Sequence, residues 1–335
     1  MSSFAVSRRR ALVLSGGALV APLAAPMVAS GIARAADDWP NKPVRYINVF
    51  PPGGPTDTLS RIVCNELAEM TGQQFIVENK AGSGGNIGTD AIAKSAPDGY
   101  TIGLYTIASQ SIAPTLYAKL SFDVAKDFTA IAMLWSVCNM LMTRLDLPAK
   151  TVPDLIKLVK ASPGKYSFAS SGAGTTPHIT GELFKQLAQV NLLHVPYKGS
   201  APGQVDVIAG RVPLMSDPLF SAMPFVRAGK LKVLAITTEE RVPGFDQFPT
   251  VAETYPGFDV RAYLGFVVPK KTPTPVVKAI QSASARALQM PDLKKKIDEL
   301  GNTPVGSSPE EFDRFIAADM KKWAKVIAEA KIPLE

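Results

Sequence analysis

The sequence predicts an α/β protein with mainly parallel sheets, covered by helices on both faces and divided between two lobes. Segments of strand length alternate with helical segments along most of the chain. The length of 335 residues suits two lobes of about 100–150 residues each. Hydrophobic residues make up 46% and charged residues 19%, a balance typical of folded proteins rather than disordered ones.

The first 35 residues are predicted to be a signal peptide that takes no part in the fold. Ser7-Arg8-Arg9-Arg10 precedes an apolar run over 11–32, and Ala33-Arg34-Ala35 has the small-x-small pattern of a signal-peptidase site. The paired arginines resemble a twin-arginine export signal. Because about 20 apolar residues can also span a bilayer, an uncleaved anchor is the alternative. Cleavage near Ala35 predicts a soluble, exported protein.

Charge and the scarcity of metal-binding side chains exclude several function classes. The formal net charge is +7, but the first 36 residues hold four arginines and no acid, so the charge gives little support to a nucleic-acid partner. Two cysteines and two histidines leave little scope for a zinc site or a Cys/His catalytic pair. We therefore expect no metal, no cofactor and no nucleic acid. Cys64 and Cys138 fit two separately buried thiols at least as well as a disulfide.

The first part of the mature chain alternates strands and helices. The apolar run 44–50 predicts a strand, and a Pro/Gly turn separates it from a helix with apolar positions 59, 62, 63, 67 and 70 at helical spacing. Asp98-Gly99 predicts a turn into another strand. The other elements predicted here are a strand at 75–77, a short helix at 88–95, a strand at 100–105, and apolar runs of strand length at 128–135 and 137–143.

The rest of the chain continues this alternation and then becomes helical. Thr151 is a good helix cap and Pro153 suits a first turn, so a helix is predicted to begin there. Ser308 and Glu311 have the spacing of a capping box for the last helix. Between them we expect strands at 166–170, 192–197, 212–216, 231–237 and 264–268, helices at 179–190 and 202–209, a helical turn at 224–228, and a loop over 239–262.

Two extended runs are predicted to carry the chain between the lobes. They lie near 137–143 and 262–268. Lobe 1 is then expected to be discontinuous, with residues 36–137 plus 264–335, and lobe 2 to be continuous over 138–263. A cleft between such lobes is a natural place for a ligand.

The first candidate binding loop, 50–57, lies between a strand and a helix. Its glycines let a ligand approach the backbone, and its N-cap residue types leave free N–H groups beside the loop, where the helix dipole attracts anions. An ordinary turn explains these residues equally well. The candidate ligand-binding residues here are Pro52, Gly53, Gly54, Thr56 and Asp57.

The second candidate loop, 170–178, repeats the pattern in the other lobe. One such loop per lobe predicts a ligand with two carboxylates, each held by one loop, with the lobes closing around it. Asp217 is a further candidate for the cleft, with a capping or turn role as its alternative. The candidate residues of the second loop are Ser170, Ser171, Gly174, Thr175 and Thr176.

Motifs for nucleotide binding and catalysis are missing from the sequence. The Gly-rich loop 81–88 has Ile87 where a dinucleotide fingerprint needs glycine, and neither Gly164-Lys165 nor Gly229-Lys230 continues as a P-loop. The chain has no G-x-S-x-G nucleophile elbow, and no acid, base and nucleophile share a recognisable spacing. We therefore name no catalytic residue, which argues against an exported hydrolase.

Taken together, these motifs resemble the solute-binding proteins of tripartite tricarboxylate transporters, the Bug family. The resemblance covers essentially the whole mature chain, and the combination is specific although each piece alone is weak. Gly203 stands where alanine is commoner in the family, a small departure near the third pocket segment. The matching segments are 50–57, 77–88, 97–101, 170–178, 195–202, 234–237, 248–253 and 265–269.

The resemblance implies a type II-like periplasmic-binding-protein fold with the ligand cleft between its lobes. It implies a periplasmic protein, not an enzyme, that captures a small carboxylate, either a di- or tricarboxylate or an aromatic acid, and delivers it to the permease subunits of the transporter. It places the ligand carboxylates at 52–57 and 170–176. A sensory binding protein that signals to a membrane receptor has the same sequence features and is the alternative. A monomer is expected because a closing cleft needs free lobes.

Overall fold

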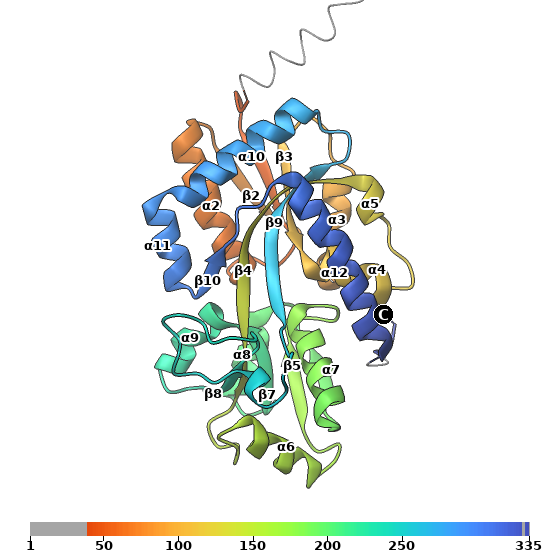
Figure 1. Ribbon diagram of the computed structural model, residues 1–335, viewed down its shortest axis with the longest axis vertical. Helices are drawn as coiled ribbons and strands as arrows, with labels where there is room; N and C mark the ends of the chain where they lie inside the picture. The colour runs from red at the N-terminus through yellow and green to blue at the C-terminus, as the bar shows by residue number, and fades with distance from the viewer. Residues whose placement is uncertain (1–38, 330–331, 335) are drawn as a thin grey trace, which may run out of the picture.

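The computed structural model describes residues 39–329 and 332–334. The predicted signal peptide lies outside this part of the chain. Within it, no helix combines the length and the apolar character that a membrane crossing requires. Figure 1 shows an elongated molecule whose upper and lower halves are joined by two long strands.

The first lobe is built on three parallel strands. β1 (Val44–Asn48) lies between β2 (Phe75–Asn79) and β3 (Thr101–Thr106) and pairs parallel with both. Two helices make the crossovers, α2 (Pro55–Thr71) and α3 (Asn86–Ala93). Val44, Ile47, Ile102 and Leu104 are buried, as expected for strands covered on both faces.

The second lobe repeats this arrangement. β5 (Ser167–Ser170) pairs parallel with β6 (Leu193–Pro196) and β7 (Leu214–Pro218). The helices of this lobe are α6 (Val152–Lys160), α7 (Thr176–Ala188), α8 (Ser200–Ile208) and α9 (Leu219–Arg227), and β8 (Lys232–Ile236) completes it. α9 extends the helical turn expected at 224–228 into a helix that begins directly after β7.

One continuous strand belongs to both lobes. β4 (Phe128–Thr143) pairs with β9 (Arg261–Pro269) as far as Cys138, and from Asn139 onward with β7 and β8. The two separate strands expected at 128–135 and 137–143 are therefore one strand, because Ser136 continues the pairing with β9. Every antiparallel pair contains β4 or β9, since a chain that crosses and returns must run in opposite directions, while the pairs within each lobe's βαβ units are parallel.

The C-terminal segment returns to the first lobe and covers it. α10 (Thr274–Gln289) and α11 (Pro291–Glu299) lead to β10 (Asn302–Pro304), which pairs with β4. α12 (Pro309–Glu329) packs on the other side of the first lobe from α11 (Figure 1). The capping box is confirmed: Glu311 N–H donates to Ser308 Oγ at 3.2 Å, and Ser308 N–H donates to Glu311 Oε2 at 2.8 Å.

The short helices between β3 and β4 were not predicted from the sequence. A π-helix, η2 (Ala108–Ile112), is followed by α4 (Ala113–Leu116) and α5 (Val124–Asp127). These segments are too short for an apolar period to be recognisable. Cys64 in α2 and Cys138 in β4 are both buried and free, so they form no disulfide.

Candidate functional site

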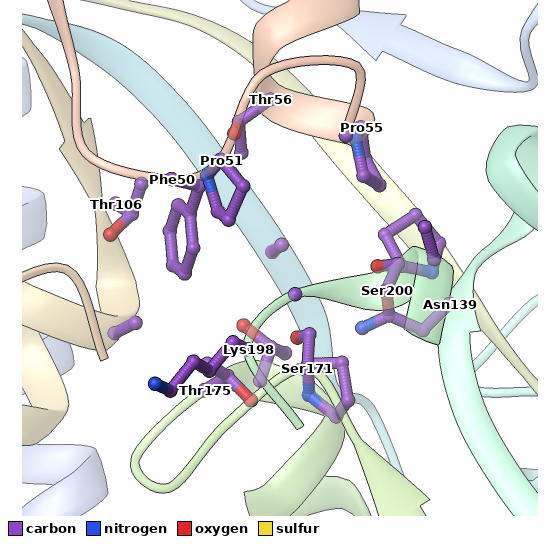
Figure 2. Close-up of a pocket in the computed structure, with 18 of the residues that line it drawn as sticks. Phe50, Pro51, Pro55, Thr56, Thr106, Asn139, Ser171, Thr175, Lys198 and Ser200 are labelled. Carbon is purple, nitrogen blue, oxygen red and sulfur yellow. The ribbon is translucent and has the colours of Figure 1, made fainter. Parts of the chain in front are cut away.

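A cleft lies where the two lobes meet, with about 720 Å³ of empty space, part of it open to solvent. Figure 2 shows the first lobe's loop, with Phe50, Pro51 and Thr56, facing Ser171 and Thr175 of the second lobe. The crossing strands contribute Asn139, Ala262 and Leu264 to the lining. The lining segments are 50–52, 54–56, 106–108, 171, 175–177 and 198–202.

Four α-helices of the described chain begin at this cleft. Their N-caps are Gly54 for α2, Thr175 for α7, Gly199 for α8 and Pro218 for α9, and all four line it. The first N–H groups of a helix lack partners within the helix and carry partial positive charge. Among the residues that the structure describes, no aspartate or glutamate lines the cleft, and Lys198 is the one charged residue in the lining. The cleft therefore suits an anion.

Of the residues predicted in the first loop, some line the cleft and others support the loop from behind. Pro52, Gly54 and Thr56 line it, and Thr56 Oγ1 is buried with no hydrogen-bond partner in the described chain. Gly53 and Asp57 do not line it. Asp57 lies behind the loop, where its carboxylate accepts hydrogen bonds of 2.9 Å from Gly53 N–H, Arg61 Nε and Asn79 Nδ2.

These contacts decide the charge and the role of Asp57. Burial opposes ionisation, but the hydrogen bonds from Arg61, Gly53 and Asn79 prevail and lower the pKa of Asp57 below its usual value. Asp57 is therefore ionised, and its hydrogen bonds stabilise the conformation of the loop. The sequence did not distinguish this role from ligand contact, because Asn79 lies 22 positions away.

The second loop divides in the same way. Ser171, Thr175 and Thr176 line the cleft, whereas Ser170 and Gly174 lie behind it. Ser170 Oγ lies 2.7 Å from His194 Nε2, and Gly174 N–H donates to His178 Nδ1 at 3.1 Å.

The two histidine rings stack with centroids 4.0 Å apart. Burial lowers the pKa of His178 to about 3 and that of His194 to about 4, so both are neutral at pH 7. The pair supports the loop from behind.

Asp217 also lies behind the lining. It is fully buried, and it accepts hydrogen bonds from Ser200 Oγ at 2.5 Å and from Gln204 Nε2 at 2.7 Å. Burial raises its pKa to about 7, against the opposing effect of the hydrogen bonds. Asp217 thus positions Ser200, which does line the cleft, at the start of α8.

Asn139 is the most informative lining residue that sequence reasoning missed. It is 0% exposed, and neither Nδ2 nor Oδ1 has a hydrogen-bond partner in the described chain. Its backbone carbonyl is engaged, accepting from Thr237 N–H at 3.0 Å. A buried amide without a partner is costly and rare. Its position in the lining (Figure 2) makes this amide a candidate partner for a ligand.

Other missed residues include Thr106, Lys198 and Ser200. Thr106 is the last residue of β3, and the carboxyl ends of parallel strands are where ligands usually bind, so its position was a usable signal. Asn139 carried a weaker signal, a polar residue within an apolar run.

The lobes also touch at the edge of the cleft. Tyr117 Oη of the first lobe donates to the Ala173 carbonyl of the second at 3.4 Å. Gly84 lies so close that a Cβ there would be 2.7 Å from the same carbonyl. In the described part of the chain, no group of three or more His, Cys, Asp or Glu residues could hold a metal.

Comparison with known proteins agrees with this geometry. The sequence profile of the tripartite tricarboxylate transporter family receptor matches residues 59–332. The structure of R. palustris Rpa4515 with adipate is 34% identical, covering 89% of this chain and 100% of that one, with a TM-score of 0.86. The periplasmic binding protein BugD is 32% identical, with coverages of 89% and 100% and a TM-score of 0.84. MatC from Rhodopseudomonas palustris, with bound malate, is 30% identical, with coverages of 86% and 100% and a TM-score of 0.81.

These likenesses confirm the two-lobed periplasmic-binding-protein fold and the resemblance drawn from the sequence motifs. The profile match covers well over half of the chain, and the related structures are covered along their whole length. The chain therefore belongs to the tripartite tricarboxylate transporter receptor family.

Proposed function

We propose that this receptor captures a small carboxylate, foremost a dicarboxylate, in the cleft between its lobes and delivers it to the permease subunits of a tripartite tricarboxylate transporter. The observation that carries the proposal is the cleft itself. Within the described chain, four helix N-termini meet there, no acidic side chain lines it, and the buried amide of Asn139 has no partner.

A dicarboxylate matches this arrangement at both ends. One carboxylate meets the start of α2 with Thr56, and the other meets the starts of α7 and α8 with Ser171, Thr175, Thr176 and Ser200. The lack of a side chain at Gly54, beside Pro52, lets the ligand approach the backbone. The ligands adipate and malate in the structures of Rpa4515 and MatC, both dicarboxylates, support this class.

The remaining predicted residues support the site in this proposal. Gly53 and Asp57 hold the first loop, Ser170 and Gly174 hold the second, and Asp217 holds Ser200. In the described part of the chain, no His, Cys, Asp or Glu lines the cleft beside its serine and threonine hydroxyls to act as a general base. The receptor accordingly binds its ligand without transforming it.

The proposal includes the setting in which the receptor works. The mature protein is a periplasmic monomer, released by cleavage near Ala35, with lobe 1 formed by 36–137 plus 264–335 and lobe 2 by 138–263. The switch of β4 from β9 to β7 and β8 between Cys138 and Asn139 supports the first boundary.

A ligand panel tests the proposal directly. Adipate, malate, citrate, an aromatic acid and uncharged dimethyl adipate are added to the purified protein, and melting temperature and heat of binding are recorded. A carboxylate at 100 times its dissociation constant is expected to stabilise the fold by about 2.7 kcal/mol, and the diester not at all. The panel is repeated after unfolding and refolding, which removes any co-purified ligand. A flat response then contradicts the proposal.

A further inference from the structure

A second cavity lies within the first lobe and shares no lining residue with the cleft. It has about 660 Å³ of empty space, part of it open to solvent, and is lined by residues of η2, α5, β4, β9 and α12. Its size suits a small molecule. The transport function requires no such cavity.

Gln110 lies in the wall of this cavity and is the reason to consider it a site. It is 1% exposed, and neither Oε1 nor Nε2 has a hydrogen-bond partner in the described residues. Its neighbours in η2 are both paired: Ser109 with Thr106 and Ser111 with Tyr105. Buried amides are nearly always satisfied, and π-helices occur frequently at functional sites.

The rest of the lining indicates which molecule fits. Phe128, Ala130, Val267 and Ile316 are buried and give the cavity apolar walls. Lys270 and Asp313 line it as exposed residues, and their opposite charges leave it without a net preference for anions. The amide of Gln110 offers one acceptor and one N–H₂ donor side by side. A primary carboxamide presents the complementary pair.

We propose that this cavity is a second ligand site, which binds a small uncharged primary amide with an apolar body. The amide carbonyl accepts from Gln110 Nε2, the amide N–H donates to Gln110 Oε1, and the body packs against Phe128, Val267 and Ile316. A carboxylate of the same length lacks the donor and is rejected. The two sites are thus separated by charge, the cleft taking anions and this cavity a neutral molecule.

The test uses hexanamide as the probe, with hexanoate as the charged comparator. Calorimetry is run on the wild-type protein, on Gln110→Leu and, as the matched control in the cleft, on Asn139→Leu. Hexanamide is expected to bind the wild type and Asn139→Leu alike, and Gln110→Leu at least about tenfold more weakly, because two hydrogen bonds are lost. The binding of hexanoate is expected to be the same in the wild type and in Gln110→Leu.

Other results would overturn the proposal. Loss of hexanamide binding in Asn139→Leu but not in Gln110→Leu would place the amide in the cleft. No binding even at about 10 mM hexanamide would leave water as the partner of Gln110. If Gln110→Leu fails to fold, Ala317→Trp fills the cavity from its exposed side without altering Gln110, and retained binding in that variant is equally contrary.

Discussion

Asn139 and Asn302 are both asparagines whose amides are buried without a hydrogen-bond partner in the described part of the chain. Asn139 is 0% exposed and Asn302 is 5% exposed. Asn139 lines the cleft, whereas Asn302 lies in β10 opposite Val137 and does not. Comparing substitutions at these two residues therefore separates the free-energy cost of burying an unpaired amide from the contribution of such an amide to ligand binding.

We expect Asn139→Leu to weaken carboxylate binding about tenfold or more, because the ligand loses a donor and an acceptor in a desolvated position. Stability should be unchanged or higher, since an unsatisfied buried amide is removed. Calorimetric titration and thermal melting measure the two effects. Asn302→Leu is the matched control, and an equal loss of affinity in that variant would show that the effect is not local to the cleft.

Asp217 gives stability a pH dependence with a definite sign. An aspartate in an unfolded chain has a pKa near 4, and burial raises the pKa of Asp217 to about 7. Between these values the folded state holds a proton that the unfolded state has released. The free energy of unfolding therefore falls as pH rises through this window, by about 1.4 kcal/mol per pH unit.

This effect is measured by urea denaturation of the wild type and of Asp217→Asn at several pH values between about 4 and 8. The free energy of unfolding of the wild type, relative to that of Asp217→Asn, is expected to fall steadily up to about pH 7 and then to level off. Parallel stability curves would mean that Asp217 is ionised throughout. Asp57, whose pKa is lowered, should instead favour the folded state above the usual carboxylate range.

At the scale of elements, local patterns predicted most of the fold. Caps and prolines are local signals, so the starts of α6 at Thr151 and of α12 at Ser308 followed from a few neighbouring residues, whereas α2 begins at Pro55, before the cap-type residues Thr56 and Asp57. Local patterns also predicted six lining residues: Pro52, Gly54, Thr56, Ser171, Thr175 and Thr176. What could not be predicted depends on distant partners. Asn139 reaches the cleft because β4 changes sheet there, and η2 is too short for a period.

The loop that contains η1 (Ser83–Gly85) meets the second lobe and depends on a glycine to do so. Gly84 has φ +62°, and a Cβ there would lie 2.7 Å from the Ala173 carbonyl and 3.1 Å from Tyr117 Oη. A side chain would therefore keep the two loops apart as well as strain the backbone.

Gly84→Ala is expected to lower carboxylate affinity by about tenfold through this separation and to cost about 1 kcal/mol of stability through the positive φ. Gly229→Ala is the matched control, since Gly229 has φ +65° and nothing within 4 Å of an added Cβ. The control should lose the same stability and keep its affinity. Calorimetric titration of both variants measures the two affinities. Equal affinities would mean that the contact between Gly84 and the Ala173 carbonyl plays no part in closure of the lobes.

At the scale of the whole molecule, the cleft is formed by both lobes, so a ligand that touches both favours the closed arrangement. Small-angle scattering should show a smaller radius of gyration when a bound carboxylate is present. The decrease should be absent in Asn139→Leu at the same ligand concentration and smaller in Gly84→Ala. An unchanged radius in the wild type at saturation would mean that the lobes are already closed without ligand.

The strand β4 also limits how receptors of this kind can be recombined. Its segment 128–138 pairs with β9, apart from two bulges, and its last five residues pair with β7 and β8, so a junction at residue 138 would join part of a strand from one parent to the rest from another. In a chimera with a foreign second lobe, Ala262 and Tyr263 of β9 would come from one parent and their partners Val137 and Ser136 from the other. New specificities are therefore easier to obtain by redesigning the loops 50–56 and 171–176 than by exchanging lobes between relatives.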